Sequence, residues 1–573
     1  MSRSEGHGAL YGTETAACEI VFGEWTKYRG IHNSCVRLHF TYRGLAVAFS
    51  CCCKWIFLRA TKFFRIATVG VLLHSSLNGG ETELQFVRLL GGAGPEDTAR
   101  AVAVDQSGCI YVAGGTRSQD FPTTSGVIQE RFASGGTSLG ANGEMDAFIT
   151  KLSPTGTVLW STFLGGPNYD RIYSIRIGND QSIYVAGRAG EGFPTTPGTL
   201  QPRFAGDNQL VNRGYGKQDG FVAKLSPDGA QLQWSTYFGT PGPSIIRDMV
   251  LDRNGDVYVT MIELKTSSPY ITDNAIVSKP IDGRESLVAK ISGDGQRVLW
   301  CTYLAGNGVD LATSLAVDSN NRLIVAGSTQ SSDFPVTAGA FQTTLKGSMD
   351  GFVTAFSSDG ELEYSTYIGG SDIDGGTSKH AVAVDQENRA WIIGFTQSTD
   401  FPVTPGAFQT SNHGALTGAW RMTADRFVAI VSADGSRVEA ATYLGGGARD
   451  GGEGIVIDRQ GNGWLTGFTF SSDFPTTPDA IQSEYRGAPK LRNPYSGGGD
   501  ATITAFTDRL GPPVYSTLMG GTGEDMLRAC AAGPDGGIIC VGTTRSNDWT
   551  PGLRSSDRRI GPDEIVVVSV RRE

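Results

Sequence analysis

The chain has 573 residues, of which 78 are glycine, 39% are hydrophobic and only 18% are charged. This composition can fill a large core and predicts many tight turns, which excludes a disordered protein and argues against long helices. The net charge of −10 is uneven, because residues 1–80 carry +5 and residues 81–573 carry −15. We therefore exclude nucleic acid as a partner, since phosphate backbones require clustered Lys and Arg.

Residues 1–82 differ from the rest and are interpreted as a leader that is disordered or signal-like. Residues 62–73 combine a basic start with an apolar stretch, as secretion signals do, but lie too far from Met1 unless translation begins later. The apolar part has eight residues, too few for a membrane helix, so no integral membrane span is expected. Five of the nine cysteines lie in the first 53 residues, and no zinc-type spacing occurs.

From residue 83 onward, a pattern of four short segments recurs seven times. The first segment ends in a glycine pair and starts at residues 86, 160, 234, 300, 364, 440 and 515, which are 64–76 residues apart. The other three are an apolar run such as residues 101–105, a second run such as 110–114, and a run that opens on an acid, such as 146–152. All are rich in β-branched or aromatic residues and are bounded by turn residues, which is typical of strands joined by hairpins.

Four strands in each of seven repeats predict an all-β fold, a single seven-bladed β-propeller with four antiparallel strands per blade, over residues 83–573. The repeats are expected near residues 93–166, 167–240, 241–306, 307–370, 371–446, 447–521 and 522–573 plus 83–92. The chain ends on a third-strand copy, residues 565–570, with no fourth strand after it. We expect residues 83–90 to supply that outer strand and close the ring onto blade 7.

The repeats resemble the SBBP-type β-propeller repeats, found mainly in bacterial secreted and surface proteins. The resemblance is carried by the series Ser-Thr-Tyr-Leu-Gly-Gly, Ala-Val-Asp-x-x-Gly-Asn, Asp-Phe-Pro-Thr-Thr-x-Gly-Ala-Phe-Gln and Asp-x-Phe-Val-x-x-Leu, and covers about residues 83–573. Blade 3 departs most, since Ser268-Pro269-Tyr270 replaces Phe-Pro-Thr. The resemblance implies a propeller and an extracytoplasmic location, secreted or on the cell surface. It implies no activity.

Acids recur at three positions of the repeat. The first set precedes the inner strand in six blades: Asp97, Asp170, Asp310, Asp374, Asp450 and Asp525. The second set opens the third strand in all seven: Asp146, Asp219, Glu285, Asp350, Asp425, Asp500 and Asp563. The third set ends the inner strand: Asp105, Asp252, Asp318, Asp385 and Asp458.

Two interpretations of these acids remain open. Carboxylates around the channel mouth could hold a cation or a basic partner, and the first set is the candidate ligand ring. Alternatively each acid accepts backbone N–H bonds in a turn, which repetition in every blade favours, and the second set is assigned that role. Asp252, Asn254 and Asp256 resemble the start of a calcium loop but lack the distal acid, so they are interpreted as a turn.

The connections between the second and third strands contain Phe-Pro segments, whose Phe residues stand at 121, 193, 334, 401 and 474. They could form a platform for a sugar or peptide, but packing over the blade edge is favoured. The variable ends of these connections are better candidates for binding, because specificity usually resides in loops on a rigid scaffold. They span residues 134–144, 206–217, 411–423 and 487–499.

Catalysis has little support in the sequence. His380 and His413 are the only histidines after residue 80, and neither lies in a recognisable nucleophile motif. Cys530 and Cys540 should face each other across a hairpin, and whether they are bridged stays open. We expect a monomeric, non-catalytic module that binds an unknown protein or glycan through its long loops, without metal or cofactor. The alternative is a propeller enzyme that acts on polysaccharide with channel-mouth carboxylates, and a cluster of non-repeated polar residues would favour it.

Overall fold

In the computed structural model, the chain divides into two compact units, Met1–Ser76 and Leu77–Glu573. The structure describes residues 35–42, 45–52, 81–206, 214–264, 267–279, 284–375, 381–414, 424–487, 499–549 and 561–572. In the first unit, β1 (Cys35–Tyr42) and β2 (Leu45–Cys52) pair antiparallel, with Cys35 opposite Cys52. The signal-like residues 62–73 lie outside the described residues.

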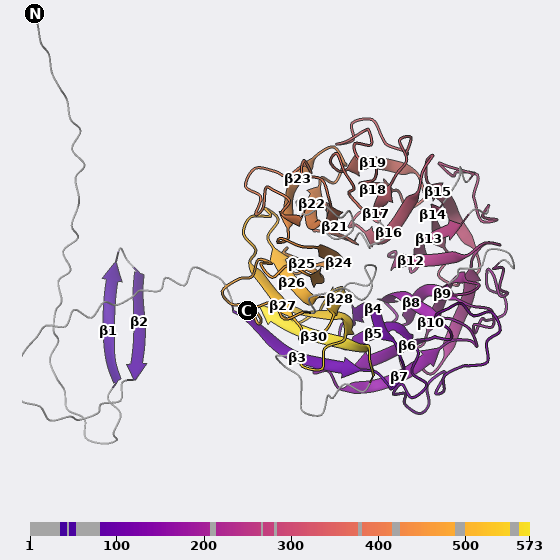
Figure 1. The fold of residues 1–573 in the computed structure, drawn as a ribbon, viewed down its shortest axis with the longest axis horizontal. Helices are drawn as coiled ribbons and strands as arrows, with labels where there is room; N and C mark the ends of the chain where they lie inside the picture. The colour runs from indigo at the N-terminus through magenta and orange to yellow at the C-terminus, as the bar shows by residue number, and fades with distance from the viewer. Residues whose placement is uncertain are drawn as a thin grey trace, which may run out of the picture. The chain divides into compact units, whose positions relative to one another are not determined.

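The second unit is a seven-bladed propeller, and each blade is one four-stranded antiparallel sheet (Figure 1). Blades 1 and 2 contain β4 (Asp97–Val104), β5 (Ile110–Thr116), β6 (Asp146–Leu152) and β7 (Val158–Leu164), then β8 (Arg171–Ile177), β9 (Ile183–Ala189), β10 (Asp219–Leu225) and β11 (Leu232–Phe238). Blades 3 and 4 contain β12 (Ser244–Leu251), β13 (Val257–Leu264), β14 (Arg284–Ile291) and β15 (Val298–Leu304), then β16 (Asp310–Val317), β17 (Leu323–Thr329), β18 (Asp350–Phe356) and β19 (Leu362–Ile368).

Blades 5 to 7 repeat the same order of strands. Blades 5 and 6 contain β20 (Ala381–Val384), β21 (Ala390–Thr396), β22 (Asp425–Val431) and β23 (Val438–Leu444), then β24 (Asp450–Ile457), β25 (Gly463–Thr469), β26 (Asp500–Phe506) and β27 (Tyr515–Met519). Blade 7 contains β28 (Asp525–Ala532), β29 (Gly537–Thr544), β30 (Glu564–Arg572) and β3 (Thr82–Leu90). The predicted fold class is confirmed. The described ranges contain no helix long and apolar enough to cross a membrane.

The ring closes through a strand from the start of the propeller. β3 pairs antiparallel with β30, with Val87 opposite Val568, and the two lie side by side in Figure 1. The Arg572 guanidinium also donates to the Thr82 hydroxyl at 2.9 Å. The predicted closure is therefore confirmed: blade 7 takes its outer strand from a segment almost 500 residues earlier, so that β30 is paired on both sides.

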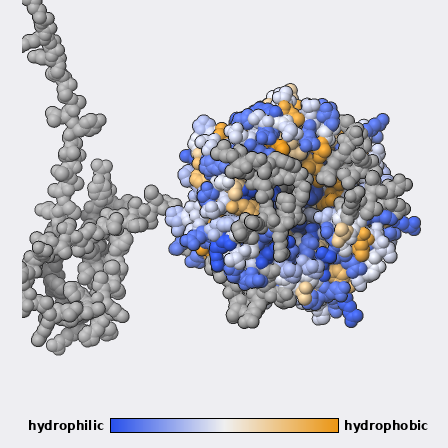
Figure 2. Space-filling view, in the orientation of Figure 1, coloured by the Kyte–Doolittle hydropathy of each residue, from blue (hydrophilic) through white to orange (hydrophobic). Residues whose placement is uncertain are grey.

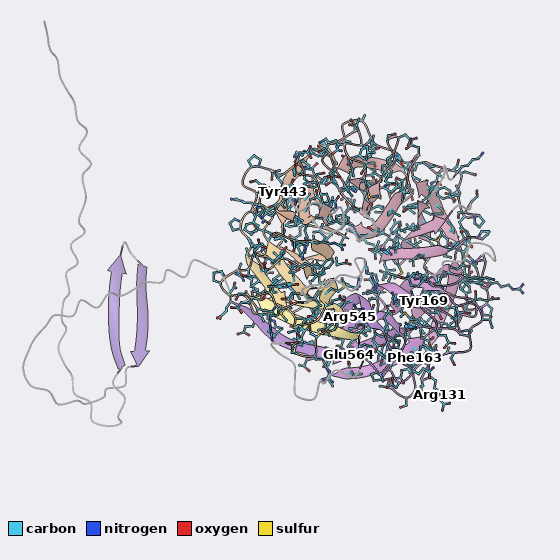
Figure 3. The ribbon with its side chains drawn as sticks, in the orientation of Figure 1. Arg131, Phe163, Tyr169, Tyr443, Arg545 and Glu564 are labelled. Carbon is cyan, nitrogen blue, oxygen red and sulfur yellow. The ribbon has the colours of Figure 1, made fainter. Side chains whose placement is uncertain are left out.

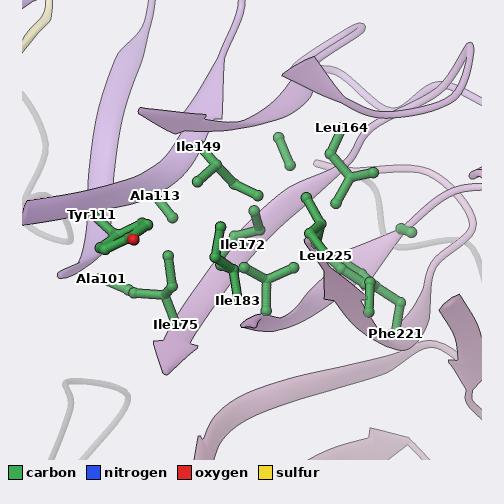
Figure 4. Packing of buried hydrophobic residues seen from close by; sticks show 14 of the residues in the cluster. Ala101, Tyr111, Ala113, Ile149, Leu164, Ile172, Ile175, Ile183, Phe221 and Leu225 are labelled. Carbon is green, nitrogen blue, oxygen red and sulfur yellow. The ribbon is translucent and has the colours of Figure 1, made fainter. Parts of the chain in front are cut away.

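The core lies between the blades, because each sheet buries both of its faces. Every residue of β5 and of β9 is buried. One cluster joins Tyr111 and Ile149 of blade 1 to Ile172, Ile183 and Phe221 of blade 2 (Figure 4). Since a sheet buried on both faces needs apolar residues on both, the strands are nearly continuous apolar runs rather than alternating ones.

The Phe of each Phe-Pro segment is a core residue. Phe121, for example, packs against Phe148 of the third strand with ring centroids 4.7 Å apart, and Phe401 stacks on Phe427 at 4.5 Å. All five are buried: Phe121, Phe193, Phe334, Phe401 and Phe474. The packing interpretation is therefore confirmed, and these rings do not form an exposed platform for a sugar or peptide.

Candidate functional site

The first set of acids lies inside the blades. All six have 0% of their surface exposed. Asp97 Oδ2 accepts from the Gly92 amide and from the Ser118 hydroxyl, both at 2.8 Å, and Asp374 Oδ2 accepts from the Ser398 hydroxyl at 2.8 Å. Each thus ties the glycine-pair turn that enters a blade to the end of the second strand. These contacts stabilise turns, and ligand binding by this set stays a prediction.

The second set anchors the connection that leads into the third strand. Asp146 Oδ2 accepts from the Ala133 amide at 2.8 Å and from Gln129 Nε2 at 3.0 Å. The same kinds of donors serve Asp219, Asp350 and Asp500. Asp425 accepts from the amides of two loop residues, Asp563 pairs with Arg545, and Glu285 is buried.

Acids of the two sets approach each other across the blade junctions, with a glycine between them. A Cβ on Gly445 would lie 2.5 Å from Asp425 Oδ1 and 2.7 Å from Asp450 Oδ2, so Gly445 leaves no room for a side chain. Burial and the neighbouring Asp450 raise the pKa of Asp425 to about 7, and burial raises that of Asp450 to about 6. Burial raises the pKa of Asp146 to about 8, helped by Asp170. Ionisation of these pairs therefore costs stability.

The third set caps the turns at the mouth of the channel. Asp385 Oδ1 accepts from the Arg389 amide at 2.9 Å, and its Oδ2 accepts from Trp391 Nε1 at 2.9 Å. A pocket of about 470 Å³ lies among the turns at residues 104–106, 384–386, 457–459 and 532–534. The acids that line this mouth are thus already hydrogen-bonded to their own turns.

The calcium-like residues form a capped turn, as interpreted. Asp252 Oδ1 accepts from the amides of Asn254 at 2.8 Å and Asp256 at 2.9 Å, and its Oδ2 pairs with Lys290 Nζ at 2.9 Å. A lysine therefore holds the position that a cation would take. Within the described ranges, no three His, Cys, Asp or Glu side chains are grouped in a way that could hold a metal ion.

The inner strands contain a feature that the sequence interpretation does not include. In six blades the pairing with the second strand skips one residue, so that the innermost strand of the blade, which lies next to the channel, has an extra unpaired residue. These residues, named here the channel layer, are Arg100, Tyr173, Arg247, Thr313, Glu453 and Arg528. They differ from blade to blade, whereas the acids repeat. His380 holds the same sequence position in blade 5, five residues before Asp385, but lies outside the described residues.

In five of the six blades a glycine in the second strand makes room for the bulge, whereas blade 3 has Met261 at that position. A Cβ on Gly114 would lie 1.9 Å from the Thr98 carbonyl oxygen, and one on Gly187 would lie 2.0 Å from that of Arg171. The same clash occurs at Gly327, Gly467 and Gly542. A glycine at this position of the second strand is therefore a sequence signal that could have located most of the channel layer.

Arginines surround Tyr173 in this layer. The Cζ atoms of Arg100 and Arg247 lie 5.7 and 5.6 Å from the Tyr173 ring centroid, so bulges of blades 1, 2 and 3 meet. Nη2 of Arg188, on β9, donates to the Tyr173 hydroxyl. The Cζ atom of Arg188 also lies 5.3 Å from the ring centroid of Tyr169, which is labelled in Figure 3. Together with Arg171 and Arg528, they are named here the arginine cluster.

Two carboxylates neutralise part of this cluster. Arg171 Nη2 lies 2.5 Å from Glu96 Oε1, and Arg528 Nη1 lies 3.8 Å from Glu453 Oε2. In the described part of the chain, the side chains of Arg100 and Arg247 form neither a hydrogen bond nor an ion pair. Five guanidinium groups therefore face two carboxylates in the middle of an acidic protein.

The cluster changes the acidity of its members. Burial by itself raises the pKa of Tyr173, but Arg188, Arg171, Arg100 and Arg247 outweigh it and lower the pKa to about 7. Burial and the charge of Arg100 lower the pKa of Arg528 to about 9, which leaves it cationic at neutral pH. The positive charge of the cluster thus favours ionisation of the Tyr173 phenol, and burial together with like charge disfavours the cationic form of Arg528.

Comparison with known proteins identifies the repeat. The model of the SBBP β-propeller repeat matches residues 85–122 and 233–260. The chain thus contains SBBP β-propeller repeats within its seven-bladed propeller. Regulatory protein FlaEY of Caulobacter vibrioides is 25% identical over 266 residues, which cover 44% of this chain and 26% of that protein. The chain thus matches about a quarter of that relative's length.

Solved structures of low similarity also match this SBBP propeller. A Dyadobacter fermentans protein of unknown function is 11% identical with a TM-score of 0.39, and the match covers 86% of this chain and 100% of that one. Quinohemoprotein alcohol dehydrogenase from Comamonas testosteroni is 9% identical with a TM-score of 0.37, and the match covers 86% and 76%. Likenesses this weak say nothing about activity.

The loops of the SBBP propeller that we predict to bind ligands are described only in part. Residues 134–144 are described, and the Glu144 carboxylate there accepts from the Gly135 amide at 2.8 Å. The centres of the other three, residues 207–213, 415–423 and 488–498, lie outside the described residues. On the face shown in Figure 2, hydrophobic residues form small patches among hydrophilic ones. Among described large hydrophobic residues, only Leu139, Leu159 and Leu299 are exposed, at 37%, 49% and 40%.

His413 of the SBBP propeller is not placed as a catalytic base. It is exposed, with Nδ1 3.3 Å from Gln409 Nε2 and Nε2 3.2 Å from the Ser411 hydroxyl. Because the glutamine amide donates to Nδ1, the ring proton is on Nε2, which then donates to the serine instead of accepting its proton. Activation of a nucleophile requires the histidine to accept the proton of the hydroxyl, so this contact does not activate Ser411.

The hairpin of blade 7 places its two cysteines in register, as expected. Cys530 and Cys540 are direct partners between β28 and β29, and both are thiols. Cys540 is buried, and burial raises its pKa, which keeps its thiol protonated and unreactive. Whether this SBBP propeller forms the bridge after oxidation stays a prediction.

Proposed function

We propose that this SBBP propeller is a non-catalytic binding module that acts outside the cytoplasm. One observation carries the proposal: the repeated acids are bound within their own blades, while the polar residues that differ between blades converge on the channel. A scaffold made of repeats, on which particular positions and loops differ from blade to blade, is typical of a binding site on a rigid frame. A regulatory protein among the relatives supports a role without catalysis, and the extracytoplasmic location rests on the resemblance to SBBP proteins.

A screen of the full chain on glycan and protein arrays tests this proposal. We expect saturable binding of at least one ligand that is recovered chemically unchanged, and no binding by heat-denatured protein. Absence of any saturable binding, or conversion of the bound ligand to products, contradicts the proposal.

A second function is favoured by the channel layer, which is a cluster of non-repeated polar residues. Tyr173, with a pKa of about 7, is a suitable general base, and the adjoining arginines could neutralise the carboxylate of a uronic acid. The phenolate would take the proton next to that carboxylate, a C=C bond would form, and the glycosidic oxygen would leave with the proton that the phenol returns. This β-elimination needs no cofactor and makes the chain an enzyme that acts on acidic polysaccharide.

Ultraviolet absorbance of the unsaturated product distinguishes the two functions. The full chain and its Tyr173→Phe variant are incubated with polygalacturonate or alginate. A rise in absorbance that Tyr173→Phe abolishes supports the enzyme and contradicts the non-catalytic module. No rise with either protein contradicts the elimination on these polymers and leaves the binding module in place.

A further inference from the structure

The arginine cluster carries more positive charge than its surroundings neutralise. Glu96 and Glu453 are the carboxylates in ion-pair contact with its five guanidinium groups, within the described ranges. Bringing cations together in a partly desolvated site is costly unless counter-charges accompany them. The propeller nevertheless places three of these arginines, Arg100, Arg247 and Arg528, at bulges that direct them toward the channel.

Buried donors of the cluster lack acceptors. Arg188 is only 4% exposed, and its Nε and Nη1 have no hydrogen-bond partner among the described residues. Arg100 Nε and Arg528 Nε are likewise buried without a partner in that part of the chain. A guanidinium group has five donors arranged to match the oxygens of a carboxylate or phosphate. An oxyanion would supply both what the donors lack and what the cluster lacks, because its oxygens accept hydrogen bonds and its negative charge offsets the arginines.

We propose that the arginine cluster binds a small oxyanion with two or more negative charges, a phosphate or a polycarboxylate, inside the channel. This deepens the proposed function, because it rests on the propeller being a binding module and names the chemistry of one ligand. Five guanidinium groups against two carboxylates leave room for more than one negative charge. A small anion is preferred to nucleic acid because residues 81–573 carry −15, and a phosphate backbone requires Lys and Arg clustered along a surface.

Isothermal titration calorimetry of the full chain with inorganic phosphate, citrate and glucose, at constant ionic strength, tests the site. We expect saturable binding of phosphate or citrate with one site per chain, no binding of glucose, and a melting temperature that rises with anion concentration. The anion that binds with the higher affinity shows whether the natural ligand carries phosphate or carboxylate groups. Absence of saturable binding for both anions overturns the proposal.

The variants Arg100→Gln and Arg247→Gln locate the site, with Arg131→Gln as matched control. Arg131 is exposed at the outer rim in Figure 3 and far from the channel layer in the fold. We expect each channel variant to weaken anion binding at least tenfold and the control to bind as the parent does. Equal binding by all three variants overturns the proposal.

The same variants show that a loss of binding is not a loss of folding. Since Arg100 and Arg247 face other arginines and form no ion pair in the described part of the chain, replacing either should leave the anion-free melting temperature unchanged or raise it. A lower anion-free melting temperature in both variants contradicts an uncompensated cluster. The two proposals can also fail separately. If the parent binds neither anion, while the parent and Arg247→Gln both bind the same ligand on the array, the anion site is wrong and the binding module is still supported.

Discussion

Deleting residues 83–92 from the full chain should lower the melting temperature sharply or cause aggregation. The deletion removes almost all of β3, so β30 loses its partner and presents unpaired N–H and C=O groups along a sheet edge. It also uncovers Val566 and Val568, which are buried. Differential scanning calorimetry and light scattering measure the effect. A truncated chain that melts cooperatively at the temperature of the parent would contradict closure by β3.

Two controls show that strand pairing is responsible. A synthetic peptide of Thr82–Leu90 should bind the deleted chain and restore part of the melting temperature, because it can replace the missing strand. In the full chain, Val87→Asp should be strongly destabilising and Gln85→Asp nearly neutral. Val87 is buried opposite Val568, whereas Gln85 is exposed at a point where the register skips a residue. Equal effects of the two substitutions would count against this packing.

The propeller should be more stable at about pH 5 than at about pH 8.5, unlike most proteins with paired carboxylates. Burial raises the pKa of Asp146 to about 8, and those of Asp170, Asp219, Asp374 and Asp500 to about 7, from an unfolded value of 3.8. Groups with raised pKa values in the folded state stabilise it fully below the unfolded pKa. That stability is lost progressively as the pH rises from the unfolded value of 3.8 through the folded values of about 7 to about 8. Urea unfolding at the two pH values measures the difference.

Substitutions at Asp146 separate its charge from its hydrogen bonds. Asp146→Ala should cost about 1–2 kcal/mol at about pH 5, because the Ala133 amide and Gln129 Nε2 lose their acceptor, and less at about pH 8.5, where it also removes a destabilising charge. Asp146→Asn keeps an acceptor oxygen and removes a charge beside Asp170, so it should be mild and should reduce the pH dependence. Stability that increases from pH 5 to pH 8.5, or equal losses in the two variants, would contradict the structural role of these acids.

The blades and their closure follow from the sequence because they depend on local patterns that repeat. Short apolar runs between turn residues define the strands, and the order of the runs along the chain is enough to assign β3 to blade 7. The expected turn role of Asp252 agrees with its contacts for the same reason, since an Asx turn depends on a few neighbouring residues. A single short segment could be assigned wrongly, but the same local pattern in seven repeats makes the assignment of each strand secure.

The channel layer does not follow from the same patterns. If the inner strand is assumed to be regular, nothing in the sequence distinguishes Arg100 from its neighbours. Only the register between β4 and β5 shows that Arg100 lies at a bulge. The meeting of Arg100, Tyr173 and Arg247 depends on three blades more than 70 residues apart in sequence. The leader interpretation likewise does not include the β1–β2 hairpin, although the alternation in Cys35–Tyr42 is a strand signal.

The ionisation of Tyr173 reports most directly on the channel layer, where the functional proposals for this protein lie. The measurement is the tyrosinate absorbance of the full chain minus that of Tyr173→Phe, followed from about pH 5 to about pH 9. Because four arginines lower the pKa of Tyr173 to about 7, one additional tyrosinate should form near neutral pH. Citrate or phosphate should move that transition upward, since a bound anion offsets the positive charge. Identical spectra across this range, with all tyrosines ionising above it, would contradict the arginine cluster and the functions proposed for it.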